Sequence, residues 1–254
     1  MGLASVEAAV RAALDEERLA AVLTVVEGTD LGAKAVVDYE AGTLAGALDV
    51  GADLLADARA LMEREQSRTL TYDEREIFIE TLAPPPHLVI FGAVHVAQAL
   101  TELATRLGYR VIVSDAREAF TTQERFPAAA EVLVGWPDEI EDRLVIDRRT
   151  YVVLLSHDAR FEDPVLPMVL ASPAKYIGAM GSRRTHAKRV EKLHRAGYTD
   201  DDIARIHGPV GLDIGAETPE ETAVSILAEM IQVRYGSGDG LSLRGREGRI
   251  HNRE

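Results

Sequence analysis

The sequence contains no cysteine, which excludes disulfide bonds, thiolate metal ligands and cysteine nucleophiles. No apolar run approaches the roughly 20 residues that a membrane-spanning helix needs. Residues 1–20 alternate apolar and charged side chains and lack the uninterrupted apolar core of a secretory signal. We therefore expect a cytoplasmic protein with no membrane partner.

Basic residues are scarce relative to acidic ones. The 28 Lys and Arg stand against 42 Asp and Glu, which gives a net charge of −14. Such a charge opposes non-specific binding to nucleic acid, so we expect no nucleic-acid partner. If the ligand is an anion, its attraction must come from a local group of basic residues. The positions of the arginines are therefore informative.

Hydrophobic residues make up 46% and charged residues 28% of the chain, which is typical of a folded protein. Three prolines at 84–86 cannot continue a helix or donate to a sheet, so we place a linker there. We expect an α+β domain over 1–83, a second domain over 87–235 and a flexible tail over 236–254. In the first domain, helices are expected at 5–18, with Ser5 as N-cap, and at 49–65, and strands at 19–26, 33–39, 68–73 and 76–83.

The second domain alternates apolar strands with helices. Strands are expected at 87–92, 109–114, 130–135, 151–156 and 175–180, and helices at 94–107, 163–171, 182–196 and 219–235. This alternation predicts an α/β fold: a Rossmann-like parallel sheet with helices on both faces, preceded by the smaller α+β domain.

The first glycine turn of that domain is a candidate nucleotide site. Gly92 ends one strand and Asp115 ends the next, where a Rossmann acid meets a ribose. Asp115 would favour NAD, while Arg117 leaves NADP open, and His95 near the start of the following helix is a further candidate cofactor-binding residue. However, Val94 stands where the fingerprint has its second glycine and would crowd the phosphate path. A Rossmann-like sheet with no working dinucleotide site is therefore the alternative.

His157 and Asp158 directly follow another apolar strand, at the edge of the sheet where ligands bind. They could bind a ligand by hydrogen bonds or act as acid and base. The alternative is that Asp158 caps the next turn and His157 lies on the surface. Adjacent residues seldom converge on one metal, so we predict no metal site.

A second glycine turn begins a strongly basic helix. Backbone N–H groups at a helix N-terminus bind anions, and glycines permit close approach. The candidate residues are Gly178, Gly181, Ser182, Arg183 and Arg184, followed by Lys188 and Arg189. Cations in a first helical turn oppose the helix dipole unless an anion offsets them. This turn indicates either a phosphate contact or a solvated helix face paired with acids elsewhere.

A long glycine-containing loop precedes the last helix and includes Gly211 and Asp213, which we add to the candidate cofactor-binding residues. The helix start itself is well signalled, with Thr218 as N-cap, Pro219 at the first position and acids behind it. Loops of this length in compact domains are often functional.

Five segments, in this order and spacing, resemble the XdhC/CoxI family of xanthine dehydrogenase accessory proteins: GAVHVAQAL, VSDAR, SHD, YIGAMGSRRTHAKR and GPVGLDIGAETPEETAVSILAEM. The resemblance covers about residues 87–235, and the last two segments are long and distinctive. The amino-terminal domain is less similar, because it lacks the family's Pro-Arg pair and has Asp49 where the family has Glu.

The resemblance implies a chaperone for the molybdenum cofactor (molybdopterin) rather than a turnover enzyme. Such a protein holds the cofactor, assists its sulfuration with a cysteine desulfurase and passes it to a molybdenum hydroxylase such as xanthine dehydrogenase. The GSRR turn would contact the pterin phosphate or nucleotide portion. Two alternatives remain: an NAD(P)-dependent oxidoreductase, or a Rossmann module that acts only through protein contacts, for example as a homodimer.

Overall fold

The computed structural model describes residues 3–156 and 159–245. The chain divides into two compact units, Met1–Pro84 and Pro85–Glu254. Among the described helices, none combines the length and apolar character that a membrane span needs.

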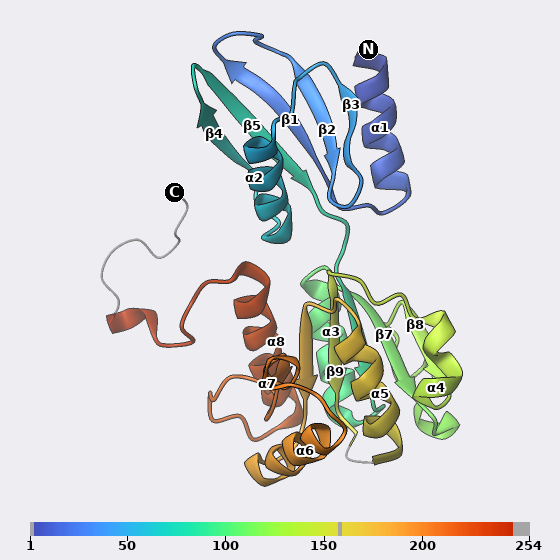
Figure 1. The fold of residues 1–254 in the computed structure, drawn as a ribbon. Helices are drawn as coiled ribbons and strands as arrows, with labels where there is room; N and C mark the ends of the chain where they lie inside the picture. The colour runs from blue at the N-terminus through green and yellow to red at the C-terminus, as the bar shows by residue number, and fades with distance from the viewer. Residues whose placement is uncertain (1–2, 157–158, 246–254) are drawn as a thin grey trace. The chain divides into compact units, whose positions relative to one another are not determined.

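The first unit is built on an antiparallel five-stranded sheet in the order β3-β2-β1-β5-β4. Its elements are α1 (Leu3–Asp15), β1 (Ala20–Glu27), β2 (Lys34–Asp38), β3 (Gly42–Gly46), α2 (Ala52–Glu63), β4 (Arg68–Tyr72) and β5 (Arg75–Leu82). Apolar side chains of β1 and β5 form one core with α2, while α1 lies along the β2–β3 side (Figure 1). The sequence did not predict the glycine-containing β3, and Ser5 lies inside α1 instead of capping it.

The second unit contains a six-stranded sheet in the order β11-β10-β9-β6-β7-β8, and every pair in it is parallel. The strands are β6 (His87–Phe91), β7 (Arg110–Asp115), β8 (Glu131–Val134), β9 (Thr150–Leu154), β10 (Tyr176–Ala179) and β11 (Ile206–His207). Between them lie α3 (His95–Arg106), η1 (Glu118–Phe120), α4 (Pro137–Ile140), η2 (Glu141–Arg143), α5 (Ala159–Ala171), α6 (Arg183–Arg195) and α7 (Asp200–Ala204), with α8 (Pro219–Tyr235) and η3 (Leu243–Gly245) following.

Helices cover both faces of this sheet (Figure 1). An apolar cluster on one face joins the strands to α3 and α8, and includes Leu100, Ala223, Ile226 and Met230. A second cluster on the other face joins them to α4, α5, α6 and α7, and includes Val165 and Leu193. The predicted fold class, a Rossmann-like parallel sheet after a smaller α+β domain, is confirmed.

The strand order reverses between β6 and β9. From β6 the chain proceeds outward to β7 and β8, and from β9 it proceeds outward in the opposite direction to β10 and β11. In open α/β sheets, ligands bind outside the carboxyl ends of the strands at such a switch point. The residues that follow the strands at this edge are therefore the first place to look for a site.

Candidate functional site

Gly92, directly after β6, is required by the packing of the switch point itself. Its φ is +115°, and a Cβ placed there would come within 2.9 Å of the Ser156 nitrogen beyond β9. Both the backbone conformation and the space therefore demand glycine. The backbone that approaches Gly92 closely belongs to the protein, so this glycine does not by itself indicate a bound pyrophosphate.

The two residues at the start of α3 differ in their surroundings. Val94, the N-cap, is half-buried and packs against the apolar cluster between α3 and α8. The sequence predicted that the Val94 side chain would crowd a bound phosphate. In the structure this side chain also packs against the core of the domain. His95, the first residue of the helix, is exposed.

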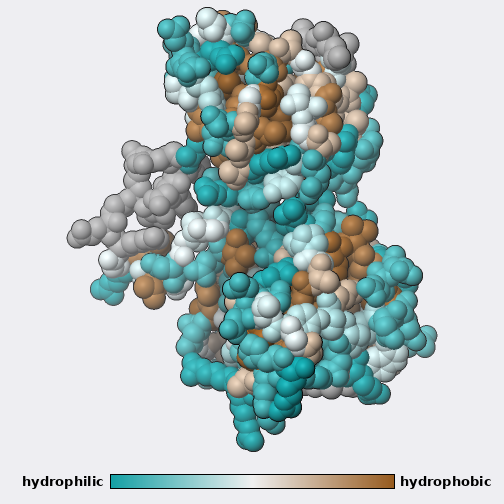
Figure 2. Space-filling model, viewed as in Figure 1, coloured by the Kyte–Doolittle hydropathy of each residue, from teal (hydrophilic) through white to brown (hydrophobic). Residues whose placement is uncertain are grey.

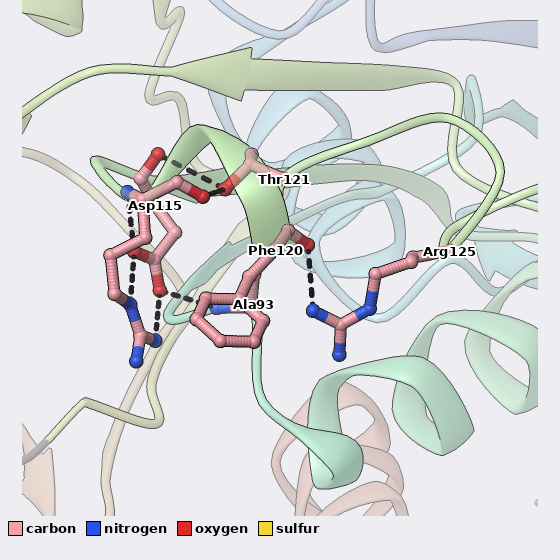
Figure 3. A network of polar contacts seen from close by, with 6 residues as sticks. Ala93, Asp115, Phe120, Thr121 and Arg125 are labelled. Carbon is pink, nitrogen blue, oxygen red and sulfur yellow. Dashed lines mark hydrogen bonds and ion pairs between the residues drawn. The ribbon is translucent and has the colours of Figure 1, made fainter.

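Asp115 ends β7 with its side chain fully buried. One carboxylate oxygen, Oδ2, accepts hydrogen bonds from the Ala93 backbone N–H at 2.8 Å and from Arg117 Nη2 at 2.6 Å (Figure 3). The other oxygen, Oδ1, accepts from the backbone N–H and the Nε of Arg117. Burial alone would raise the pKa of Asp115, but the bonds from Arg117 and Ala93 hold that pKa below its ordinary value. Asp115 thus ties β7 to the first glycine turn and is not free to meet a ribose.

Gly178 lies within β10, and its missing side chain makes room for neighbouring residues. A Cβ at this position would come within 2.7 Å of the Tyr176 ring and 2.6 Å of Val210. The ring lies over the glycine, and the Tyr176 hydroxyl donates to Glu229 of α8 at 2.5 Å. The close packing of Tyr176 and Val210 against its backbone gives Gly178 a structural role in the sheet.

The turn after β10 leads into α6 through Gly181 and Ser182. Gly181 has a φ of +139°, and Ser182 caps the helix by accepting a hydrogen bond from the Thr185 N–H. Arg183 and Arg184 then occupy the exposed first turn. In Figure 2, the surface over α6 is largely hydrophilic.

The basic residues of α6 fall into two groups. Within the described chain, Arg183, Arg184 and Lys188 are exposed and have no acidic partner. Every basic residue farther along the helix has one: Arg189 with Glu162, Lys192 with Asp163, His194 with Asp200 and Arg195 with Glu191. Among the basic residues of α6, those without an ion pair are therefore confined to the first half of the helix, near the carboxyl end of β10.

Arg189 was expected to belong to the exposed basic surface of the helix, and this expectation is wrong. Its side chain is only 2% exposed. It forms a bidentate ion pair with Glu162 of α5, with Nε–Oε1 and Nη2–Oε2 distances of 2.6 and 3.1 Å. It also donates to the Met180 carbonyl at 3.0 Å. Its role is to fasten α6 to α5 and to the end of β10.

The loop before α8 is anchored at three successive residues. The Val210 N–H donates to the Ala179 carbonyl at the end of β10, and the Leu212 N–H donates to the Ser225 carbonyl in α8. Between them, the Gly211 N–H donates to the Glu229 carboxylate at 2.8 Å. The following residue, Asp213, is exposed.

Glu229 lies where α8, β10, β11 and this loop meet. Besides the bonds from Gly211 and Tyr176, it has His207 Nδ1 at 3.2 Å. Burial by itself would raise the pKa of Glu229, but these donors outweigh burial and hold the pKa below its ordinary value. Glu229 was not among the residues that the sequence motifs predicted to be functional. A carboxylate three residues after the apolar Ile226, within a periodic helix, was the available signal.

The structure thus brings the candidate residues to one edge of the sheet, in separate groups. One group lies at the ends of β6 and β7 and consists of Gly92, His95, Asp115 and Arg117. The other lies around the end of β10 and consists of the candidates from Gly178 to Arg184, together with Gly211 and Asp213. His157 and Asp158 lie outside the described residues. In the described part of the chain, no group of three or more His, Asp or Glu side chains is arranged to hold a metal ion.

Residues 88–230 of the sequence match the family model of the XdhC Rossmann domain. The chain belongs to this family. It is 35% identical over 151 residues to the molybdenum cofactor insertion chaperone PaoD of Escherichia coli (strain K12), with 59% of this chain and 41% of that protein covered. It is 33% identical over 158 residues to a probable xanthine dehydrogenase subunit of Bacillus subtilis (strain 168), with 62% and 46% covered.

A third relative is the E. coli protein YqeB, 32% identical over 169 residues, with 66% of this XdhC-family chain and 31% of YqeB covered. The chain therefore spans less than half the length of these relatives. A crystal structure described as a xanthine dehydrogenase from Bacillus halodurans matches with a TM-score of 0.54 at 20% identity, over 88% of this chain and 92% of that one. At that identity the likeness concerns the fold alone.

Proposed function

We propose that this XdhC-family chain is an accessory factor that binds the molybdenum cofactor as cargo and delivers it to a xanthine dehydrogenase or a related molybdenum hydroxylase. The names of the chaperone PaoD and of the B. subtilis xanthine dehydrogenase subunit support this role. The proposal includes assistance with cofactor sulfuration by a cysteine desulfurase partner. On this proposal the protein binds the cofactor and transfers it, and the client enzyme catalyses the hydroxylation reaction.

The observation that carries the proposal is the group of unpaired basic residues at the start of α6. In a chain of net charge −14, Arg183, Arg184 and Lys188 have no acidic partner within the described residues. Two arginines in a first helical turn oppose the helix dipole, at a cost of about 0.3–1 kcal/mol each. A bound phosphate removes that cost and accepts charge-assisted hydrogen bonds from the guanidinium groups.

The position of this group suits a cofactor that carries a phosphate. It follows β10 at the carboxyl edge of the sheet, where α/β folds bind ligands. The anchored loop with Gly211 and Asp213 lies against the same strand end, because Val210 bonds to Ala179. We propose that the turn holds the phosphate and that this loop lines the remainder of the site.

The NAD(P)-dependent alternative gains no support from the geometry. It depended on an Asp115 able to bind a ribose, whereas within the described residues that carboxylate accepts four hydrogen bonds, from Ala93 and Arg117. A ribose would have to displace the guanidinium group of Arg117 from a buried carboxylate, which is costly.

The test is to co-express the protein with molybdenum cofactor synthesis and to measure bound pterin by fluorescence after acid release, and molybdenum by mass spectrometry. The variant Arg183→Ala/Arg184→Ala is expected to lose bound cofactor by at least tenfold, since a hydrogen bond to a charged group contributes about 1.5–3 kcal/mol. The control is Arg195→Ala, which removes an exposed arginine of the same helix that is already paired with Glu191.

Unchanged cofactor content in the double variant would refute the role of the turn. Wild-type protein that carries neither pterin nor molybdenum, and that does not bind added cofactor, would refute the function itself.

A further inference from the structure

An exposed aromatic residue follows β7, on the other side of the switch point from α6. Phe120 is 44% exposed, although it is large and apolar. The guanidinium carbon of Arg117 lies 4.9 Å from the centroid of its ring, and that of Arg125 lies 5.0 Å from it. Figure 3 shows the Phe120 ring between the Asp115 carboxylate, to which Arg117 is bound, and Arg125. We call these three residues, Arg117, Phe120 and Arg125, the β7 arginine cluster.

Both arginines are held in place by contacts within the protein. Arg117 is fastened by its two bonds to the buried Asp115. Arg125 donates from Nη1 to the Phe120 carbonyl at 3.2 Å and also lies over the ring of the buried Phe126. Arginine side chains that are already fixed lose little conformational freedom when a ligand binds. The cluster is therefore preorganised.

The charges of the two arginines are balanced differently. The positive charge of Arg117 is offset by Asp115. Arg125 has no ion pair within the described chain, and neither Glu118 nor Glu124, its acidic neighbours in sequence, pairs with it there. In a chain of net charge −14, Arg125 thus carries a positive charge that no described acidic side chain pairs with.

The spacing of the arginines indicates what could bind. Since both lie about 5 Å from one ring centroid, their guanidinium carbons are at most about 10 Å apart. One anion with several oxygens can contact both groups, and a diphosphate carries such oxygens on two phosphorus atoms. The ring also keeps water from one side of each guanidinium group, which strengthens its electrostatic attraction.

We propose that the β7 arginine cluster is a binding site for a diphosphate-bearing ligand, with Arg125 as the principal contact. This site is distinct from the α6 turn, because β6 and β9 lie between β7 and β10 in the sheet. It goes beyond the cofactor-delivery function proposed above and does not depend on it.

The test is isothermal titration of the full chain with inorganic pyrophosphate, in protein that carries Arg183→Ala/Arg184→Ala so that the α6 turn cannot contribute. We expect one saturable site, weakened about tenfold by Arg125→Gln. Phe120→Leu, which leaves every charge in place, is also expected to weaken binding, because the arginines lose the ring that orders them. Arg143→Gln, which removes an exposed arginine paired with Glu131, is the matched control and should bind normally.

Absence of saturable binding, or equal affinity in the Arg125→Gln and control proteins, would overturn the proposal. Inorganic phosphate that binds as tightly as pyrophosphate would overturn the assignment to diphosphates. The pterin content of the α6 variants is measured separately, so failure of this site leaves the cofactor-delivery function to its own test.

Discussion

Replacement of Glu162 by glutamine is expected to destabilise the second unit by about 3 kcal/mol, because it leaves a buried arginine without its counter-charge. The Arg189 side chain is 2% exposed and donates hydrogen bonds to both carboxylate oxygens of Glu162, whose side chain is 19% exposed. Removal of one partner of a buried pair typically costs about 3–5 kcal/mol, and the partial exposure of Glu162 places the expected value at the lower end.

The neighbouring residue provides a matched control. Asp163 also pairs with a basic residue of α6, but that pair is on the surface, with Lys192 60% and Asp163 49% exposed. Exposed pairs contribute about 0–1 kcal/mol, so Asp163→Asn is expected to change stability little. The two substitutions alter adjacent residues by the same chemical change and differ mainly in burial.

The single tryptophan makes the measurement specific to this unit. Trp136 packs against Phe161, with ring centroids 4.8 Å apart, so its fluorescence reports on the region next to Glu162. With a urea dependence of about 1–3 kcal/mol per molar, a loss of about 3 kcal/mol moves the unfolding midpoint down by roughly 1–3 M. Equal midpoints for Glu162→Gln and Asp163→Asn would refute the reasoning.

Two further predictions concern the region where α8 meets the sheet. Because the folded-state pKa of Glu229 is lowered, its contribution to stability is present above the unfolded value, near 4.5, and is lost as pH falls through the folded pKa. Glu229→Gln should therefore lower the free energy of unfolding by about 1–3 kcal/mol at pH 7. Urea unfolding at several pH values should show that the difference in free energy of unfolding between variant and wild type becomes smaller in acid. A difference that does not change with pH would contradict this. Gly178→Ala should cost about 1–3 kcal/mol through the clash with Tyr176 and Val210. In calorimetry, Gly245→Ala, an exposed position in the same unit where the added Cβ meets nothing, should change stability by less than about 0.5 kcal/mol, and a similar small effect at Gly178 would contradict the packing argument.

Short-range patterns in the sequence predicted most of the elements of the second unit. Apolar runs such as residues 87–92 became buried parallel strands. The start of α8 formed as expected, with Thr218 as N-cap, Pro219 in the first turn and Glu221 completing the capping box. These features could be predicted because the contacts that stabilise them join residues only a few positions apart. The short elements α7 and β11 were not predicted, since two to five residues carry too little periodicity.

The sequence by itself determined the fold class, the family and the concentration of candidate residues at the carboxyl ends of the strands. Only the tertiary structure distinguished residues of the same type. Arg183 is exposed and Arg189 is buried against Glu162, although both belong to one basic helix. Asp115 lies at the position where a ribose-binding acid would lie, yet its carboxylate accepts hydrogen bonds from Arg117 and Ala93. In each case the decision depends on which charged or polar group from another element comes within hydrogen-bonding distance, and burial then determines how strong that contact becomes.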